Sequence, residues 1–217
     1  MLYLATPSSP EIRAAMSAGD LGCMTTPAQG NHLPERTLIG ADNGKFGKQW
    51  RGATHWYDWR TTTVARYGTN RFLFGVAPDV PFNACGTLIE SMPWLPRIRH
   101  LGIPAAFAAQ DGSEVGLVPW DDLDVLFLAG STAWKIGPAA QHLAHEAQER
   151  GLPVHMGRVN SRRRLRIAEA FGCTTCDGTY LAYGPDRNLP QLLTWLTEMR
   201  QEPPSFSSRP PSRAVAQ

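Results

Sequence analysis

The feature of this chain that most constrains its fold is a series of short apolar runs, each of which ends in small or polar residues. Their apolar character is continuous rather than alternating, which is typical of parallel strands buried on both faces. We therefore predict strands at Leu2–Ala5, Leu21–Thr25, Thr37–Ala41, Phe72–Ala77, Ala105–Ala109, Val125–Gly130, Val154–Gly157 and Thr174–Cys176.

Helix-compatible segments lie between these runs, and capping residues mark their ends. Serine and proline are favoured where a helix begins, and glycine is favoured where one ends. The alternation of strands and helices predicts a compact (β/α)8 TIM-type barrel, with a doubly wound open sheet as the alternative. The predicted helix boundaries fall at Ser9 with Pro10, at Gly151, at Ser161, at Gly172 and at Asn188–Pro190.

The chain has 217 residues, which we interpret as one barrel domain over residues 1–201 and a tail over residues 202–217. The tail is rich in proline and serine and poor in apolar residues, so we predict that it is disordered. The N-terminus does not have the pattern of a signal peptide, and no apolar run approaches the ~20 residues of a membrane span. We expect a cytoplasmic protein that makes no membrane contact.

Four cysteines are present, and Cys173 and Cys176 have the spacing of a CxxC pair. Neither a second such pair nor a pair of histidines follows at the spacing of a zinc site. We interpret these two cysteines as small core residues around a strand. The sequence therefore predicts neither a bound metal nor a cofactor.

Polar residues follow several of the predicted strands. Asp42, Asp79, Gln110 and Asp177 each come directly after such a run or within a few residues of its end. In a barrel of this kind, active sites form at the carboxyl ends of the strands, so we expect these side chains to converge on one rim. The alternative for any single aspartate is a helix cap or a turn.

The order of the residues at these strand ends resembles the tRNA-guanine transglycosylase superfamily, including its DNA-directed 7-deazaguanine branch. The resemblance rests on ADNGKF, VAPD, AAQDG, LAGST, HMGRV and TTCDGT, which lie between Leu38 and Thr179. Lys45 stands where the family has its second glycine, and Gly178 where it usually has Cys or Ser. No cysteine follows Asp177, so the resemblance implies a barrel without the family's zinc subdomain and favours DNA over tRNA.

The resemblance assigns roles to individual residues. It implies that Asp177 is the nucleophile that traps a sugar C1′ and that Asp42 is the general acid/base, a role favoured by a pKa raised through burial. For Phe46 and Met156, which would sandwich the base, core packing is the alternative. The implied base-binding residues are Phe46, Asp79, Gln110, Gly130, Ser131, Met156 and Gly157.

Two arginine-rich stretches are candidates for contact with a nucleic-acid backbone. The first stretch follows residue 157 and leads into a predicted helix that begins at Ser161, and the N-terminus of a helix favours bound phosphate. The other spans residues 48–71, where tryptophans alternate with arginines. The alternative for both is that the aromatic residues pack against the barrel and the charges face water. The residues concerned are Arg158, Asn160, Ser161, Arg162 and Arg163 in the first stretch, and Arg51 and Arg60 in the second.

Together these inferences predict a pentosyltransferase that exchanges guanine in DNA for a 7-deazaguanine base, such as the 7-cyano form, through a covalent Asp–C1′ intermediate. The expected partners are DNA, or tRNA, and the free 7-deazaguanine base, with a homodimer or an accessory protein left open. The net charge of +2 does not by itself require a nucleic acid. The alternatives are exchange in tRNA, a deazaguanine nucleoside glycosidase, and an inactive barrel that binds nucleic acid.

Overall fold

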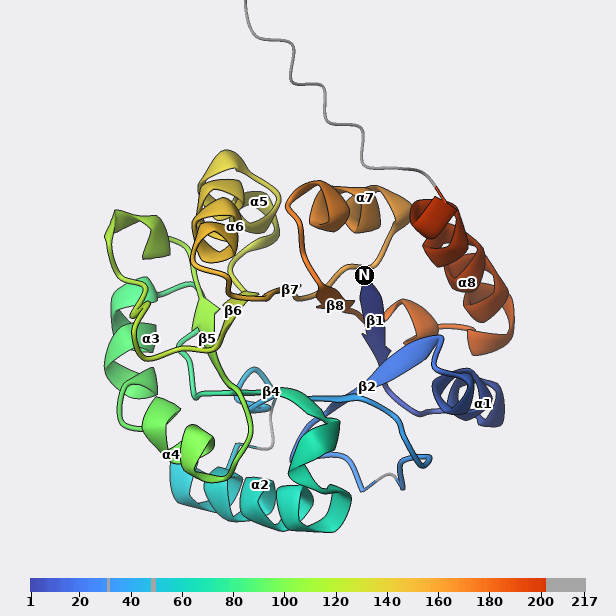
Figure 1. Ribbon diagram of the computed structural model, residues 1–217, viewed down its shortest axis with the longest axis horizontal. Coiled ribbons are helices and arrows are strands. Elements are labelled where there is room, and N and C mark those ends of the chain that lie inside the picture. The colour runs from blue at the N-terminus through green and yellow to red at the C-terminus, as the bar shows by residue number, and fades with distance from the viewer. Residues whose placement is uncertain (31, 48–49, 202–217) are drawn as a thin grey trace, which may run out of the picture.

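The computed structural model describes residues 1–30, 32–47 and 50–201, so the predicted tail lies outside the described residues. Its centre is a closed barrel in which eight parallel strands pair in chain order and β8 returns to pair with β1 (Figure 1). The predicted (β/α)8 barrel is therefore confirmed, and closure between β1 and β8 excludes the open sheet.

The strands are three to five residues long. Each observed strand matches a predicted run, because continuous apolar runs are what a sheet buried on both faces requires. Their bounds are β1 (Leu2–Ala5), β2 (Leu21–Thr25), β3 (Ile39–Ala41), β4 (Phe72–Val76), β5 (Ala105–Ala109), β6 (Val125–Leu128), β7 (Val154–Met156) and β8 (Thr175–Asp177).

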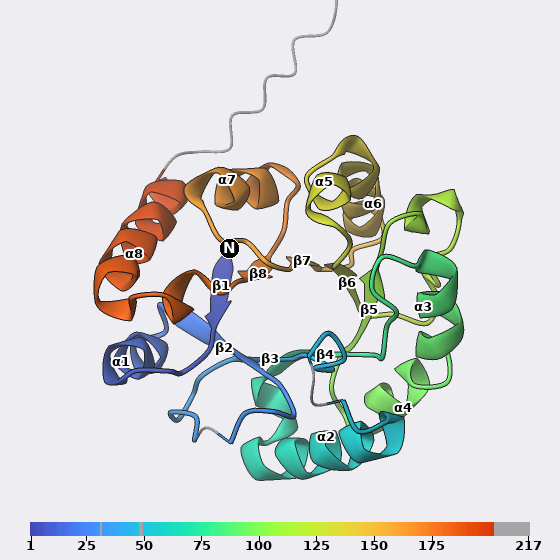
Figure 2. The ribbon, with the colours of Figure 1, turned by 180° about the vertical axis from the view of Figure 1, so that it is seen from behind.

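Helices surround the barrel as an outer ring, which both views show (Figures 1 and 2). The Ser9 and Ser161 side chains cap their helices, as predicted, by accepting from the backbone N–H of Ile12 and Arg164. The last helix begins at Pro185, earlier than predicted, and the Asn188 side chain donates to backbone carbonyls instead of capping the helix. The helices are α1 (Pro10–Ala18), α2 (Ala53–Tyr67), α3 (Ala84–Ser91), α4 (Leu95–His100), α5 (Thr132–Lys135), α6 (Pro138–Glu149), α7 (Arg162–Ala170) and α8 (Pro185–Gln201).

Two apolar layers follow from the alternation of side chains along each strand. The inner layer fills the barrel and comes from strand residues alone, whereas the outer layer joins the strands to the helices. Along β5, for example, Ala106 and Ala108 belong to the inner layer, and Ala105, Phe107 and Ala109 belong to the outer one. The same alternation decides which residues at the strand ends face the barrel mouth.

The segment predicted to contact nucleic acid includes α2, whose inner face packs on the barrel. Trp56 is 1% exposed and Arg60 is wholly buried, with its guanidinium 4.7 Å from the Trp56 ring centre. Tyr57, Trp59 and Tyr67 pack against the outer layer. The prediction that Arg60 contacts a nucleic acid is therefore wrong, and the alternative of aromatic packing against the barrel is confirmed for Trp56.

We predict that Gly75→Ala destabilises the barrel by about 3 kcal/mol, since overpacking a tight core costs amounts of this order. An added Cβ at Gly75 would lie 1.9 Å from Arg60 Nη1 and 3.0 Å from Ile103 Cδ1. Gly30→Ala is the matched control, because a Cβ there meets nothing within 4 Å. Urea denaturation of both variants is the measurement, and equal midpoints would contradict the packing described for Arg60.

Candidate functional site

A cavity of about 210 Å³ opens at the carboxyl ends of the strands. Most of its lining comes from inward-facing strand positions or from the residue two places beyond them, as the alternation requires. The four polar residues predicted to converge on the rim all line it. The lining residues are Asp42, Asn43, Phe46, Val76, Asp79, Ala108, Gln110, Phe127, Ala129, Gly157, Arg158 and Asp177.

Asp42 follows β3 and is partly buried at the base of the loop after it. Burial raises the pKa of its carboxyl to about 6, and the nearby charges of Asp79 and Asp177 act in the same direction. The backbone N–H groups of Asn43 and Gly44 oppose this shift, and the first of them donates to Asp42 Oδ1 at 2.7 Å. Asp42 can therefore exchange a proton close to neutral pH.

Asp79 is held by two amides. Asn43 Nδ2 donates to one of its oxygens at 2.8 Å, and Gln110 Nε2 donates to the other at 2.6 Å. Gln110 Oε1 accepts from the Phe82 backbone N–H at 3.0 Å, so its orientation is fixed. Burial is the main cause that raises the pKa of Asp79. Sequence reasoning missed Asn43, whose position directly after Asp42 was the available signal.

Asp177 closes the cavity at the end of β8 and takes part in a buried chain of hydrogen bonds. His155 Nε2 lies 3.0 Å from Asp177 Oδ1, and His155 Nδ1 lies 2.7 Å from Thr175 Oγ1. An ionised carboxylate only accepts, so Nε2 carries the proton in this arrangement. The Arg158 backbone N–H also points to Asp177 Oδ1, at 3.3 Å. These donors fix the carboxylate and stabilise its negative charge.

His155, and not Met156, faces the barrel interior on β7. Met156 is wholly buried in the outer layer, whereas the His155 ring lies 4.5 Å from that of Phe127 and 4.8 Å from that of Phe74. The prediction that Met156 covers a bound ring is not supported, since neighbouring side chains of a strand point to opposite faces. Thr175, two residues before Asp177, faces the same side of the sheet as Asp177, and His155 is its partner on β7. The alternation of side chains could therefore have identified His155.

Three residues from separate loops cover the cavity. Phe46 is 64% exposed and meets Phe82 edge to face at 6.0 Å, while the Arg158 guanidinium lies 5.3 Å from the Phe46 ring centre. Arg158 Nη2 also donates to the Ala129 and Gly130 carbonyls at 2.7 and 2.5 Å. Arg158 and Phe82 both have positive φ, a costly conformation that often marks functional sites.

Lys135 is a buried cation near this rim that the sequence reasoning did not consider. It is 1% exposed, and among the described residues its Nζ has no hydrogen-bond partner. Burial lowers its pKa to about 7; the charge of Arg158 acts in the same direction and that of Asp177 opposes it. Its charge state thus responds to pH near neutrality.

Gly157 also lines the cavity, and an added Cβ at this position would meet the Phe127 ring at 2.6 Å. The remaining predicted site residues lie outside the cavity lining. Ser131 donates to Asp111 through both its backbone N–H and its hydroxyl, at 2.6 Å each. Asn160 pairs with Thr179. Arg162 forms an exposed ion pair with Glu198 at 2.6 Å. The remaining predicted contact residues are Gly130, Ser161, which caps α7, and the exposed Arg51 and Arg163.

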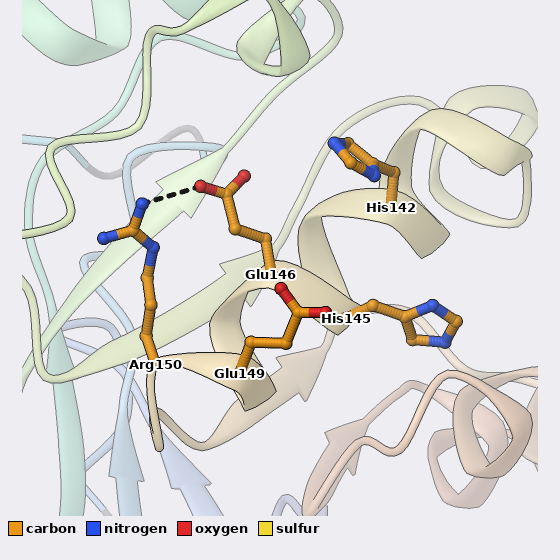
Figure 3. A pocket seen from close by; sticks show the side chains of 5 residues that line it. All are labelled: His142, His145, Glu146, Glu149 and Arg150. Atoms are coloured by element: carbon orange, nitrogen blue, oxygen red, sulfur yellow. Dashed lines mark hydrogen bonds and ion pairs between the residues drawn. The ribbon is translucent and has the colours of Figure 1, made fainter.

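A second hollow, of about 460 Å³, lies on the outer face of α6 (Figure 3). Its lining comes from one helix and its end, where Arg150 forms an ion pair with Glu146. Within residues 1–30, 32–47 and 50–201, no group of three or more His, Cys, Asp or Glu is placed to hold a metal ion. The hollow is lined by His142, His145, Glu146, Glu149 and Arg150.

The fold and the position of the cavity define a (β/α)8 barrel with a site at its mouth. No family model matches the chain, and no curated protein matches it. One similar solved structure is that of the Bacillus subtilis YkuI protein, which has an EAL domain and is in complex with its substrate c-di-GMP and calcium. It is 16% identical to this chain with a TM-score of 0.44, and the match covers 76% of this chain and 45% of that one. The PaMucR phosphodiesterase in its c-di-GMP complex is 12% identical with a TM-score of 0.41, over 67% of this chain and 60% of that one.

These comparisons contradict the resemblance to the transglycosylase superfamily. The two structural neighbours are a protein with an EAL domain and a phosphodiesterase, neither of them a transglycosylase, and no sequence match supports that family. The predicted pentosyltransferase activity, with its DNA or tRNA partner and its 7-deazaguanine base, is therefore wrong. Since the likeness to the neighbours is weak, neither their activity nor their ligand is transferred to this chain.

One feature of the helices bears on membranes. In the part of the chain that the structure describes, no helix combines the length and the apolar character needed to cross a bilayer.

Proposed function

We propose that the cavity is the active site of an acid–base hydrolase that acts on a small, neutral, polar molecule. The observation that carries this proposal is a pair of carboxyl groups in different environments at the barrel mouth. Asp42 has a pKa raised to about 6, whereas Asp177 accepts from His155 and from a backbone N–H. Two carboxyl groups whose environments differ in this way are the usual basis for an acid and an anion that act together.

The roles proposed for Asp42 and Asp177 follow from these environments. Protonated Asp42 donates to the leaving group as the bond breaks, because its raised pKa keeps the proton available near neutral pH. The carboxylate of Asp177, held by His155 and by the Arg158 backbone N–H, stabilises positive charge on the substrate or orients the attacking water. Asp42 then recovers a proton from that water. Hydrolysis requires no co-reactant other than water, and these two side chains are sufficient for its proton transfers.

The cavity limits what the substrate can be. Its volume of about 210 Å³ corresponds to roughly seven water molecules, which suits one ring-sized group. Asp42, Asp79 and Asp177 outnumber the cation in its lining, Arg158, so an anionic group would be disfavoured and hydrogen-bond donors such as hydroxyl or amino groups would be favoured. Phe127 and Phe46 offer apolar faces to a ring.

The test is a panel of chromogenic substrates that separates neutral from anionic compounds. The neutral arm contains p-nitrophenyl glycosides, esters and anilides, and the anionic arm contains bis-p-nitrophenyl phosphate and c-di-GMP. We expect turnover in the neutral arm that falls by about a hundredfold or more in Asp42→Asn. Turnover of anionic substrates alone, or turnover that Asp42→Asn leaves unchanged, would overturn the proposal.

Two further predictions remain proposals. We keep residues 1–201 as a single catalytic domain, since the described barrel uses strands and helices from Leu2 to Gln201. We keep the cytoplasm as the compartment, because all four cysteines are free, as is usual where thiols stay reduced.

A further inference from the structure

Arg60 is the most deeply buried cation near the site and has no role in the proposed chemistry. It lies on the inner face of α2, is wholly buried, and sits between the helix and the ends of β3 and β4. Its Nη2 donates to the carbonyls of Ala41 and Val76 at 3.1 Å each, and to that of Asp42 at 3.4 Å. One guanidinium nitrogen therefore joins the ends of two neighbouring strands at the backbone that carries Asp42.

The surroundings of Arg60 are fitted to a guanidinium. Trp56 and Trp59 place their rings 4.7 and 5.9 Å from it, and Gly75 lacks the side chain that would collide with Nη1. Among the described residues, Nε and Nη1 have no hydrogen-bond partner, and no ion pair to Arg60 is present. A buried charge without a paired carboxylate is costly, and an apolar side chain would fill the same space without that cost.

The charge of Arg60 acts on Asp42. Burial lowers the pKa of Arg60 to about 9, and the charge of Asp42 opposes that shift. Arg60 thus remains protonated at neutral pH, and by reciprocity its cation favours the ionised form of Asp42. The other ionisable groups that act on Asp42 are Asp79, after β4, and Asp177, on β8; both are acidic and disfavour its ionisation. Arg60, from α2, is a cation that opposes them, since the charge of Asp42 raises the pKa of Arg60.

We propose that Arg60 is a positioning residue for Asp42: its guanidinium fixes the backbone that carries this carboxyl, and its charge keeps Asp42 able to release as well as hold a proton. The inference rests on the proposed function only in that it makes Asp42 an acid–base group. Without Arg60, the two neighbouring carboxyl groups of Asp79 and Asp177 would make Asp42 hold its proton more tightly, and release of that proton would become slow.

The experiment is an NMR titration of the Asp42 carboxyl in the whole chain, with the resonance assigned through Asp42→Asn. We expect a midpoint near 6 in the unchanged protein, and a rise of about one pH unit in Arg60→Met, the effect of losing one opposite charge. Arg60→Lys keeps the charge and not the planar fork, so its midpoint should stay close to that of the unchanged protein. Arg66→Met, at an exposed site on the same helix, should leave the midpoint unchanged.

A midpoint in Arg60→Met equal to that in Arg66→Met would overturn the proposal and leave Arg60 with a packing role alone. If Arg60→Met does not fold, Arg60→Gln replaces it, because it removes the charge and retains a donor for the strand carbonyls. The titration uses no substrate, so the role of Arg60 is decided even if the proposed hydrolase activity fails. Where turnover is present, its limb near pH 6 should move upward with the Asp42 midpoint.

Discussion

Asp177→Asn is expected to reduce turnover of any neutral substrate found for this protein by about a thousandfold or more, because it removes the anion that the reaction requires. Asparagine has nearly the same shape, so the cavity should persist. His155 Nε2–H would still find an acceptor in the amide oxygen, in place of Asp177 Oδ1 at 3.0 Å. The measurement is kcat for the variant and for the unchanged protein on the same substrate, with thermal unfolding in parallel.

The control for this prediction is Asp58→Asn, which changes an exposed aspartate on α2. It should leave both kcat and the melting temperature unchanged. Asp177→Asn should not lower the melting temperature, since it removes one of the negative charges that act on Asp42. A variant that is folded and fully active would remove Asp177 from the mechanism, and one that is unfolded would show that its role is structural.

The barrel could be predicted from sequence because most strands are short, continuously apolar runs, and a polar residue or a glycine comes within a few residues of their ends. A strand buried on both faces is apolar without interruption, and this pattern differs from the alternating pattern of an amphipathic element. The start of a helix could also be predicted where a side chain caps it, as at Ser9 and Ser161. At Asn188 the side chain bonds instead to the carbonyls of Tyr180 and Tyr183, which no local pattern reveals.

The sequence predicted the site only in so far as active sites of these barrels form at the carboxyl ends of the strands. Asp42, Asp79, Gln110 and Asp177 line one cavity because the carboxyl ends of parallel strands meet at one rim. The rule says nothing of which side chains face inward, so His155 was missed in favour of its neighbour. Similarly, a pattern of arginines among tryptophans does not distinguish a surface from a helix face turned inward, and Arg60 is buried.

The activity was the least predictable part. Short motifs at strand ends, such as VAPD or AAQDG, carry residue types that many barrel enzymes place there for different reactions. Six weak motifs in order share a common cause in the barrel itself, so their agreement is not independent evidence for one chemistry. The carboxyl groups in the cavity support acid–base chemistry without identifying the substrate.

Asp42 should also make the stability of the fold depend on pH. Its pKa is raised from 3.8 to about 6, so between these values the folded state holds a proton that the unfolded chain releases. The stabilisation from protonated Asp42 is therefore complete below pH 3.8 and is lost as the pH rises through 6. The difference of about two pH units corresponds to a loss of about 3 kcal/mol at most.

Asp42→Asn mimics the protonated carboxyl at every pH, so the variant should escape this loss. We expect it to be more stable than the unchanged protein at pH 8, by an amount approaching 3 kcal/mol, and to lose most of this advantage at pH 4. Urea denaturation at the two pH values measures the difference, with Asp58→Asn as the exposed control that should show no such dependence. An advantage of Asp42→Asn that is the same at both pH values would mean that Asp42 titrates normally. The acid–base role would then lose its physical basis, because a carboxyl with an ordinary pKa carries almost no proton near neutral pH.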